Sequence, residues 1–173
     1  MYNVFSKEEV KQKVAAALAE DDAIPVSGMS ETLGLNEGAI TFALPDEMVT
    51  HVGGSYAKLV LEQLSEWGKV TTIVHSFGSI FEVKANFPKG KEAHGYYNLM
   101  GRDGELHGHL RLDLVENIAL VSKPFRGAES HYIGFFDAAG HCVFKVYLGR
   151  DEKRQLFPHQ VEAFVKMKKE FAA

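Results

Sequence analysis

The sequence contains a single cysteine, Cys142, and lacks any apolar run long enough to cross a membrane. One cysteine excludes an intramolecular disulfide and agrees with a reducing compartment. A membrane-spanning helix needs roughly 20 consecutive apolar residues. The first 20 residues are charged and amphipathic and lack the apolar core of a secretory signal. We therefore expect a cytoplasmic protein that makes no membrane contact.

Excess positive charge is also missing. The chain has 19 Lys and Arg against 23 Asp and Glu, a formal net charge of −4. Residues 26–44 have the spacing of a helix-turn-helix, but its second helix would present no Lys or Arg to DNA phosphates. The sequence therefore favours a structural helical hairpin here, and we expect no nucleic-acid partner.

Common catalytic motifs are absent. No serine lies in a G-x-S-x-G elbow, no P-loop is present, and no G-x-G-x-x-G follows a predicted strand. The 173 residues and 46% hydrophobic content suit one domain over residues 1–173, large enough to form a core without disulfides.

The spacing of apolar residues changes near residue 68. Before it, helical spacing and a capping box at Ser6 predict a helical N-terminal region, residues 1–67. After it, alternation predicts an antiparallel sheet over residues 68–149, followed by a C-terminal helix over 157–172. The predicted strands are 69–76, 79–86, 95–101, 106–112, 117–123, 131–136 and 141–148. The fold class is therefore α+β, with N-terminal helices, a large antiparallel β-sheet meander and a C-terminal helix.

Two segments give specific expectations about side-chain direction. The helix expected from Ser55 to Trp67 should face inward with Leu59, Val60 and Leu64. Alternation in strand 141–148 predicts one buried face, on which Cys142 is an inert thiol. The residues of that face are Cys142, Phe144, Val146 and Leu148.

Histidines are frequent, with eight in the chain. In strand 106–112, His107, His109 and Arg111 alternate with apolar residues and glycine and so share one face. This face is either a solvated polar surface or a binding surface. The H-x-H pair could also chelate zinc or copper, although no third ligand has matching spacing.

A second group of candidates consists of His75 and two tyrosines. His75 ends a β-branched strand and is either a core histidine or an axial ligand of haem iron. Tyr96 and Tyr97 should point to opposite faces of their strand, so that one phenol is open to a ligand such as ferric iron. Arg102 or Arg111 could help to stabilise a phenolate. We expect these candidates to lie on strands of a single sheet.

Four ordered segments carry a family likeness. They are EWGKVTTIVH (66–75), FPKGKEAHGYYNLMGRDGELHGHLRL (87–112), NIALVSKPFRGAESHYIGFF (117–136) and FKVYLGRDEKRQLFPHQVEAF (144–164). Together they resemble the HutX/HuvX/ChuX group of intracellular haem-utilisation carriers over about residues 66–164.

The resemblance implies a fold similar to half of a two-repeat HemS-type protein, and a homodimer that mimics the repeat. It implies that the protein binds ferric haem (iron protoporphyrin IX) and passes it to a haem-degrading partner without being an enzyme itself. The family's ligand positions correspond to Tyr96, the leading ligand, to His75, the second, and to His109, which would line the pocket or ligate from the other side. The alternatives are a haem-degrading enzyme that uses an external reductant, and a non-haem metal-binding or interaction domain.

Overall fold

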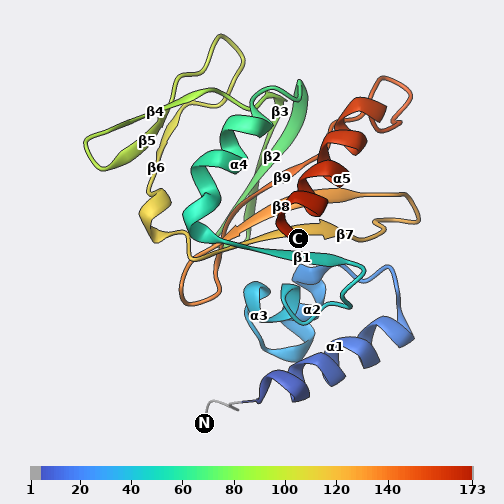
Figure 1. The fold of residues 1–173 in the computed structure, drawn as a ribbon. Helices are drawn as coiled ribbons and strands as arrows, with labels where there is room; N and C mark the ends of the chain where they lie inside the picture. The colour runs from blue at the N-terminus through green and yellow to red at the C-terminus, as the bar shows by residue number, and fades with distance from the viewer. Residues whose placement is uncertain (1–4, 173) are drawn as a thin grey trace.

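The computed structural model describes residues 5–172, so residues 1–4 and 173 of the predicted domain lie outside the described residues. Apart from strand β1, which lies between α3 and α4 in the region predicted to be helical, its elements follow the order of helices, sheet and final helix (Figure 1). This confirms the α+β class. The helices are α1 (Lys7–Glu20), α2 (Val26–Leu33), α3 (Glu37–Thr41), α4 (Ala57–Leu64) and α5 (Pro158–Ala172), with 3-10 turns η1 (Gly54–Tyr56) and η2 (Leu112–Leu114).

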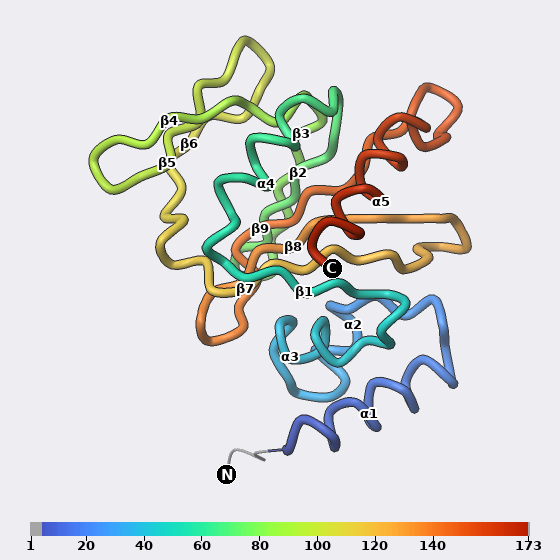
Figure 2. Tube along the Cα trace, viewed as in Figure 1, coloured from blue at the N-terminus to red at the C-terminus, as the bar shows by residue number. Residues whose placement is uncertain are grey.

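The strands of residues 5–172 form two antiparallel sheets. The larger sheet has the order β1-β7-β8-β9-β2-β3. Its strands are β1 (Val49–Gly53), β2 (Lys69–Ser76), β3 (Ser79–Asn86), β7 (Asn117–Ser122), β8 (His131–Phe136) and β9 (Cys142–Tyr147). The smaller sheet consists of β4 (Gly90–Ala93), β5 (Tyr96–Leu99) and β6 (Gly108–Leu110). Figure 2 shows that the smaller sheet extends from the body on the side away from α1.

The strands do not form the single continuous meander that we expected, but three shorter antiparallel segments. Hairpins β2-β3, β4-β5-β6 and β7-β8-β9 follow chain order, but β9 pairs back onto β2 through Thr71 and Tyr147. The sequence patterns missed β1, which is short, and β4, whose GKEA sequence shows no apolar alternation. The expectation that all candidate residues lie in a single sheet is wrong, because β5 and β6 leave the larger sheet.

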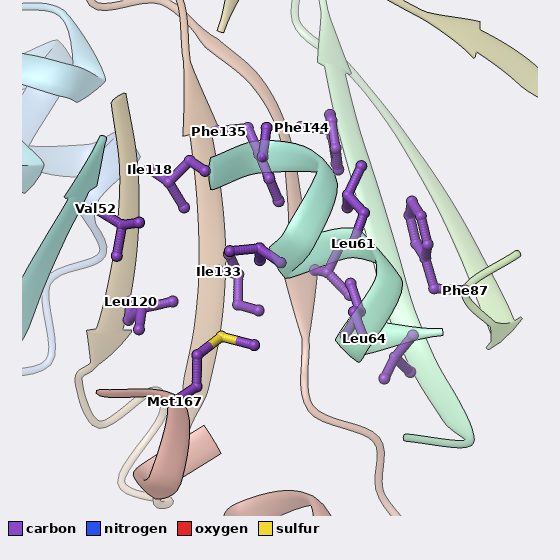
Figure 3. Packing of buried hydrophobic residues seen from close by; sticks show 14 of the residues in the cluster. Val52, Leu61, Leu64, Phe87, Ile118, Leu120, Ile133, Phe135, Phe144 and Met167 are labelled. Carbon is purple, nitrogen blue, oxygen red and sulfur yellow. The ribbon is translucent and has the colours of Figure 1, made fainter. Parts of the chain in front are cut away.

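Helices α4 and α5 cover one face of the larger sheet, and α1, α2 and α3 lie on the other (Figure 1). In Figure 3, Leu61 and Leu64 of α4 and Met167 of α5 point into a common core with Ile133 and other apolar side chains of the strands. Burial of each such side chain contributes about 1.5–3 kcal/mol. Among the described residues, no helix has both the length and the apolar character of a membrane span.

The predicted N-terminal caps of α1 and α3 are confirmed, but the predicted buried face of α4 is wrong at one residue. Ser6 and Glu9 form the predicted capping box, and Asn36 caps α3 by accepting a hydrogen bond from the Ala39 amide. In α4, Val60 and Leu64 are fully buried as predicted, whereas Leu59 is 45% exposed. The buried face of this helix consists of Ala57, Val60, Leu61 and Leu64.

A β-bulge corrects the prediction for Cys142. Phe135 pairs with Phe144, but Phe136 pairs with Cys142, so one extra residue, Val143, stands in β9. The alternation breaks there, and Cys142 packs with Phe136 in the core under the N-terminal helices instead of with Phe144. The prediction that Cys142 shares a face with Phe144 is therefore wrong, although the residue is largely covered. Burial raises the pKa of its thiol to about 12.

Candidate functional site

The predicted ligands separate into two cavities. His75, near the end of β2, lines a cavity of about 790 Å³ on the face of the larger sheet opposite α4 and α5. Tyr96, at the start of β5, lines a second cavity of about 530 Å³ on the smaller sheet. His109 of β6 lies beside Tyr96, with ring centroids 5.9 Å apart in an edge-to-face arrangement. The structure thus brings Tyr96 and His109 together and places His75 in a separate cavity.

The His75 cavity is built by strand register. Alternate residues of β2 point to it, because their neighbours Val70 and Val74 face the core under α4. On β3 and β9 the opposite residues complete the floor, since His75 pairs with Ile80 and Ile73 pairs with Glu82 and Lys145. His75 is exposed here, so its interpretation as a buried core histidine is wrong.

Cations outnumber acids around this cavity. The lining cations are Lys69, Lys84, Arg126, Lys145, Arg150 and Arg154, and the lining acids are Glu82 and Asp151. Lys145 is committed elsewhere, since its Nζ lies 3.2 Å from a carboxylate oxygen of Glu37 and both side chains are mostly buried. The remaining cations and the apolar side chains of Ile73 and Ile80 suit an amphipathic anion with carboxylates at its edge.

The two adjacent tyrosines differ in exposure as the alternation predicts. Tyr96 is 41% exposed, whereas Tyr97 is 2% exposed in the core. Burial raises the pKa of Tyr97, which disfavours a phenolate at that position. The Tyr97 ring packs so closely on Gly90 that a Cβ at residue 90 would lie 2.1 Å from the ring. Tyr97 is therefore a structural residue, and Tyr96 is the phenol open to a ligand.

The structure chooses between the two candidate cations. The guanidinium carbon of Arg111 lies 5.9 Å from the Tyr96 ring centroid. Arg111 is held by two hydrogen bonds to the carboxylate of Asp113, at 2.8 and 2.7 Å. The Asp113 carboxylate, and to a smaller degree Tyr96, raise the pKa of Arg111 above its usual value. Arg102 is exposed and does not line this cavity, so Arg111 is the cation beside Tyr96.

His109 is held by a hydrogen bond to a residue of the neighbouring strand. Asn98 of β5 is its direct neighbour in register, and the Asn98 Oδ1 atom lies 2.6 Å from the Nδ1 atom of His109. His107 precedes β6 and is exposed. Within residues 5–172, no three His, Cys, Asp or Glu side chains gather around a point that could hold a metal ion. The H-x-H pair therefore has no third protein ligand among them, and the arrangement does not suit a dedicated zinc site.

The donor sets of both cavities suit a haem as cargo. Each cavity offers an exposed oxygen or nitrogen donor for iron, Tyr96 or His75. The larger cavity also has arginine and lysine side chains that can pair with propionates, whereas the cation that lines the smaller one is Arg111, which is paired with Asp113. Arg150 and Arg154, which lie in the charged turn after β9 and line the larger cavity, were not among the candidates predicted from the sequence. That turn contains three Lys and Arg within GRDEKRQL, but its position over the sheet face depends on tertiary structure.

Comparison with known proteins gives a consistent picture. A family model described as haem utilisation ChuX/HutX matches residues 50–167. The chain is 58% identical over 163 residues to the intracellular haem transport protein HutX of Vibrio cholerae serotype O1, covering 94% of this chain and 84% of that protein.

Two solved structures show the same fold. The haem-binding protein ChuX has a TM-score of 0.83 at 31% identity and covers 92% of this chain and 99% of its own. Holo-PhuS from Pseudomonas aeruginosa has a TM-score of 0.76 at 12% identity, and the match covers 95% of this chain but 48% of that one. The fold is therefore similar to half of the longer protein, as predicted.

Proposed function

The chain belongs to the ChuX/HutX haem-utilisation family, and on that premise we propose that it binds haem inside the cell, carries it, and delivers it to a haem-degrading partner. Two relatives support the proposal, since HutX is an intracellular haem transport protein and ChuX is a haem-binding protein. The carrier role requires haem to be bound reversibly and released intact.

The observation that carries this proposal for the site is the setting of Tyr96. Its phenol is exposed at a cavity, has the Arg111 guanidinium above its ring and has His109 beside it. An anionic phenolate oxygen is a good ligand for ferric iron, and a neighbouring cation stabilises that anion. We propose Tyr96 as the iron ligand in the ferric state, with His109 beside its ring.

His75 remains the second proposed ligand. Its larger cavity provides Arg126, Arg150 and Arg154, which could hold the two propionates of a haem bound through the imidazole. Haem held by Tyr96 and haem held by His75 would contact different sheets, so separate substitutions distinguish the two sites.

We also propose a homodimer. Strand β3 is the edge of the larger sheet, and no partner strand covers it among residues 5–172. Near this edge, Phe77, Ile80 and Phe81 are strongly exposed. An uncovered edge with large apolar side chains is a typical site for pairing with another chain. Two copies together would then correspond to the two repeats of the longer proteins.

The alternative function is haem degradation with an external reductant. The observation that favours this alternative is that Tyr96 faces a cavity, so an iron bound to its phenol could have a coordination site accessible to oxygen. A carrier and an enzyme differ in what happens to the porphyrin, so the product decides between them.

A haem titration tests binding and ligand together. Purified protein is titrated with hemin and followed by its visible spectrum, using wild type, Tyr96→Phe, His75→Ala and His109→Ala. We expect a saturable Soret band in wild type and a changed charge-transfer spectrum with about 10- to 100-fold weaker binding in Tyr96→Phe. Tyr97→Phe is the matched control, since that buried phenol should not change the spectrum.

Two results would contradict the assignment. Absence of a saturable Soret change in wild type removes haem binding itself. A Tyr96→Phe spectrum that matches wild type, together with loss of binding in His75→Ala, moves the iron to the larger cavity.

A further inference from the structure

Asn98 lies on β5 two residues after Tyr96 and pairs in register with His109, and its amide can adopt only one orientation. The Nδ2 group lies 3.0 Å from the carbonyl oxygen of Lys91, 3.1 Å from that of Ala93 and 3.3 Å from that of Tyr96. All three partners accept hydrogen bonds, so Nδ2 must be the donor. Turning the amide over would set Oδ1 against three carbonyl oxygens. The hydrogen bonds therefore fix Oδ1 on the side of His109.

This orientation determines the protonation pattern of the His109 ring. Asn98 Oδ1 lies 2.6 Å from His109 Nδ1, and an amide oxygen can only accept. The hydrogen must therefore be on Nδ1. A neutral imidazole has one N–H, so Nε2 carries the lone pair.

We propose that Asn98 is a positioning residue that holds His109 in the Nδ1–H tautomer, so that His109 acts on bound haem through Nε2. The inference rests on the proposed haem function for its consequence, but the tautomer is a property of the protein before haem arrives. With the lone pair on Nε2, His109 can coordinate iron or accept a hydrogen bond from the Tyr96 hydroxyl. Both roles need the same nitrogen, and outer hydrogen-bond partners commonly fix ligand histidines in this way.

Two other histidines in the described chain contrast with His109. His131 has both ring nitrogens engaged, Nδ1 with Ser122 and Nε2 with Glu129, and so has no free lone pair. His75 has no ring hydrogen bond to any residue between 5 and 172, so its ring is not oriented in advance.

The charged and titratable neighbours of the site do not compete for His109 Nδ1. Glu92 and His94 come from β4 and the following turn, and Arg111 and Asp113 come from the segment after β6. Arg111 and Asp113 are paired with each other, and Glu92 is bound by Lys58 at 3.0 Å. Asn98 is therefore the partner that sets the tautomer.

The test measures the tautomer in the haem-free protein. Ring-nitrogen NMR shifts of uniformly ¹⁵N-labelled protein at about pH 8 separate the two tautomers of each neutral histidine. In wild type we expect His109 to be almost entirely Nδ1–H. Asn98→Ala should convert it to a mixture like that of exposed His107, which serves as the internal reference.

The second readout is the haem affinity of the same variant. We expect about 10- to 100-fold weaker hemin binding in Asn98→Ala. A His109 ring that is mainly Nε2–H in wild type overturns the inference, and this measurement needs no variant to fold. Wild-type affinity in a folded Asn98→Ala variant also overturns it. If wild type binds no haem while the tautomers behave as expected, the proposed function fails and the tautomer assignment stands.

Discussion

At the scale of single residues, side chains of the same type lie in different surroundings. Tyr96 and Tyr97 are adjacent on β5, yet the pleat exposes one phenol and buries the other, and burial raises the pKa of Tyr97. Arg111 and Arg102 are both exposed, but Arg111 stands over the Tyr96 ring and Arg102 does not line that cavity. We therefore expect ligand binding at this site to depend on the Tyr96 phenol and the Arg111 guanidinium.

Removing the Arg111 charge should weaken haem binding without unfolding the protein. Arg111→Gln deletes the cation that stabilises a Tyr96 phenolate, and we expect roughly tenfold weaker hemin binding by spectroscopic titration. Arg102→Gln is the matched control and should bind as wild type. Equal losses in both variants would show that the effect is general electrostatic attraction and not a contact with Tyr96.

Cys142 should be chemically silent in the folded protein. Its folded thiol pKa of about 12 lies above the ordinary 9.0, so folding favours the neutral thiol. The stabilisation is complete below about pH 9 and is lost as the pH rises toward 12. We expect no reaction with a disulfide reagent at pH 8 in native protein and complete reaction in urea. Rapid native labelling would contradict the buried position.

At the scale of elements, helix α5 is joined to the sheet by one buried amide. Gln160 is fully buried, accepts a hydrogen bond from the Gly149 amide at 2.7 Å, and donates to the carbonyl oxygens of Trp67 and Lys69 at 3.0 and 2.8 Å. These three bonds tie α5 to the start of β2 and to the end of β9. The same turn after β9 holds Arg150 and Arg154 over the larger cavity.

Replacing this amide should cost substantial stability. Gln160→Leu leaves buried backbone groups without partners, each costing about 1–3 kcal/mol, and we expect a loss of about 3 kcal/mol in urea unfolding. Exposed Gln155→Leu, five residues earlier, should change the free energy of unfolding by no more than about 0.5 kcal/mol. A Gln160→Leu variant as stable as wild type would show that the loops rearrange.

The elements also show what local sequence could predict. Strands β2, β3 and β8 end where alternation ends, and α1 starts at its capping box, because these signals are local. The division into two sheets, the pairing of β9 with β2 and the bulge at Val143 depend on contacts between distant segments. For the site, alternation predicted that Tyr96 and Tyr97 point to opposite faces, but not which phenol is open. The position of Asn98 beside His109 depends on the register of β5 with β6.

At the scale of the whole molecule, the N-terminal helices and α4 with α5 cover opposite faces of the larger sheet (Figure 1). Residues of β2, β3 and β9 line the larger cavity. The smaller sheet, which lies away from α1 (Figure 2), carries residues of the second cavity. Both cavities are open to solvent at their rims, as a carrier that must load and release its cargo requires.

The proposed dimer gives a prediction at this scale. Sedimentation velocity should show a two-chain species for wild type. Phe81→Glu, which places a charge on the uncovered β3 edge, should shift it to a monomer, whereas Val165→Glu on exposed α5 should not. A wild-type monomer at micromolar concentration would contradict the dimer.

The most direct test of a haem carrier follows the fate of the porphyrin. Haem-loaded wild-type protein is mixed with excess apomyoglobin, and parallel samples also receive a reductant and oxygen in the presence of catalase. We predict that the Soret band moves quantitatively to that of holomyoglobin and that the total haem is conserved under both conditions. Loss of the Soret band with formation of an open tetrapyrrole would contradict the carrier account and favour an enzyme.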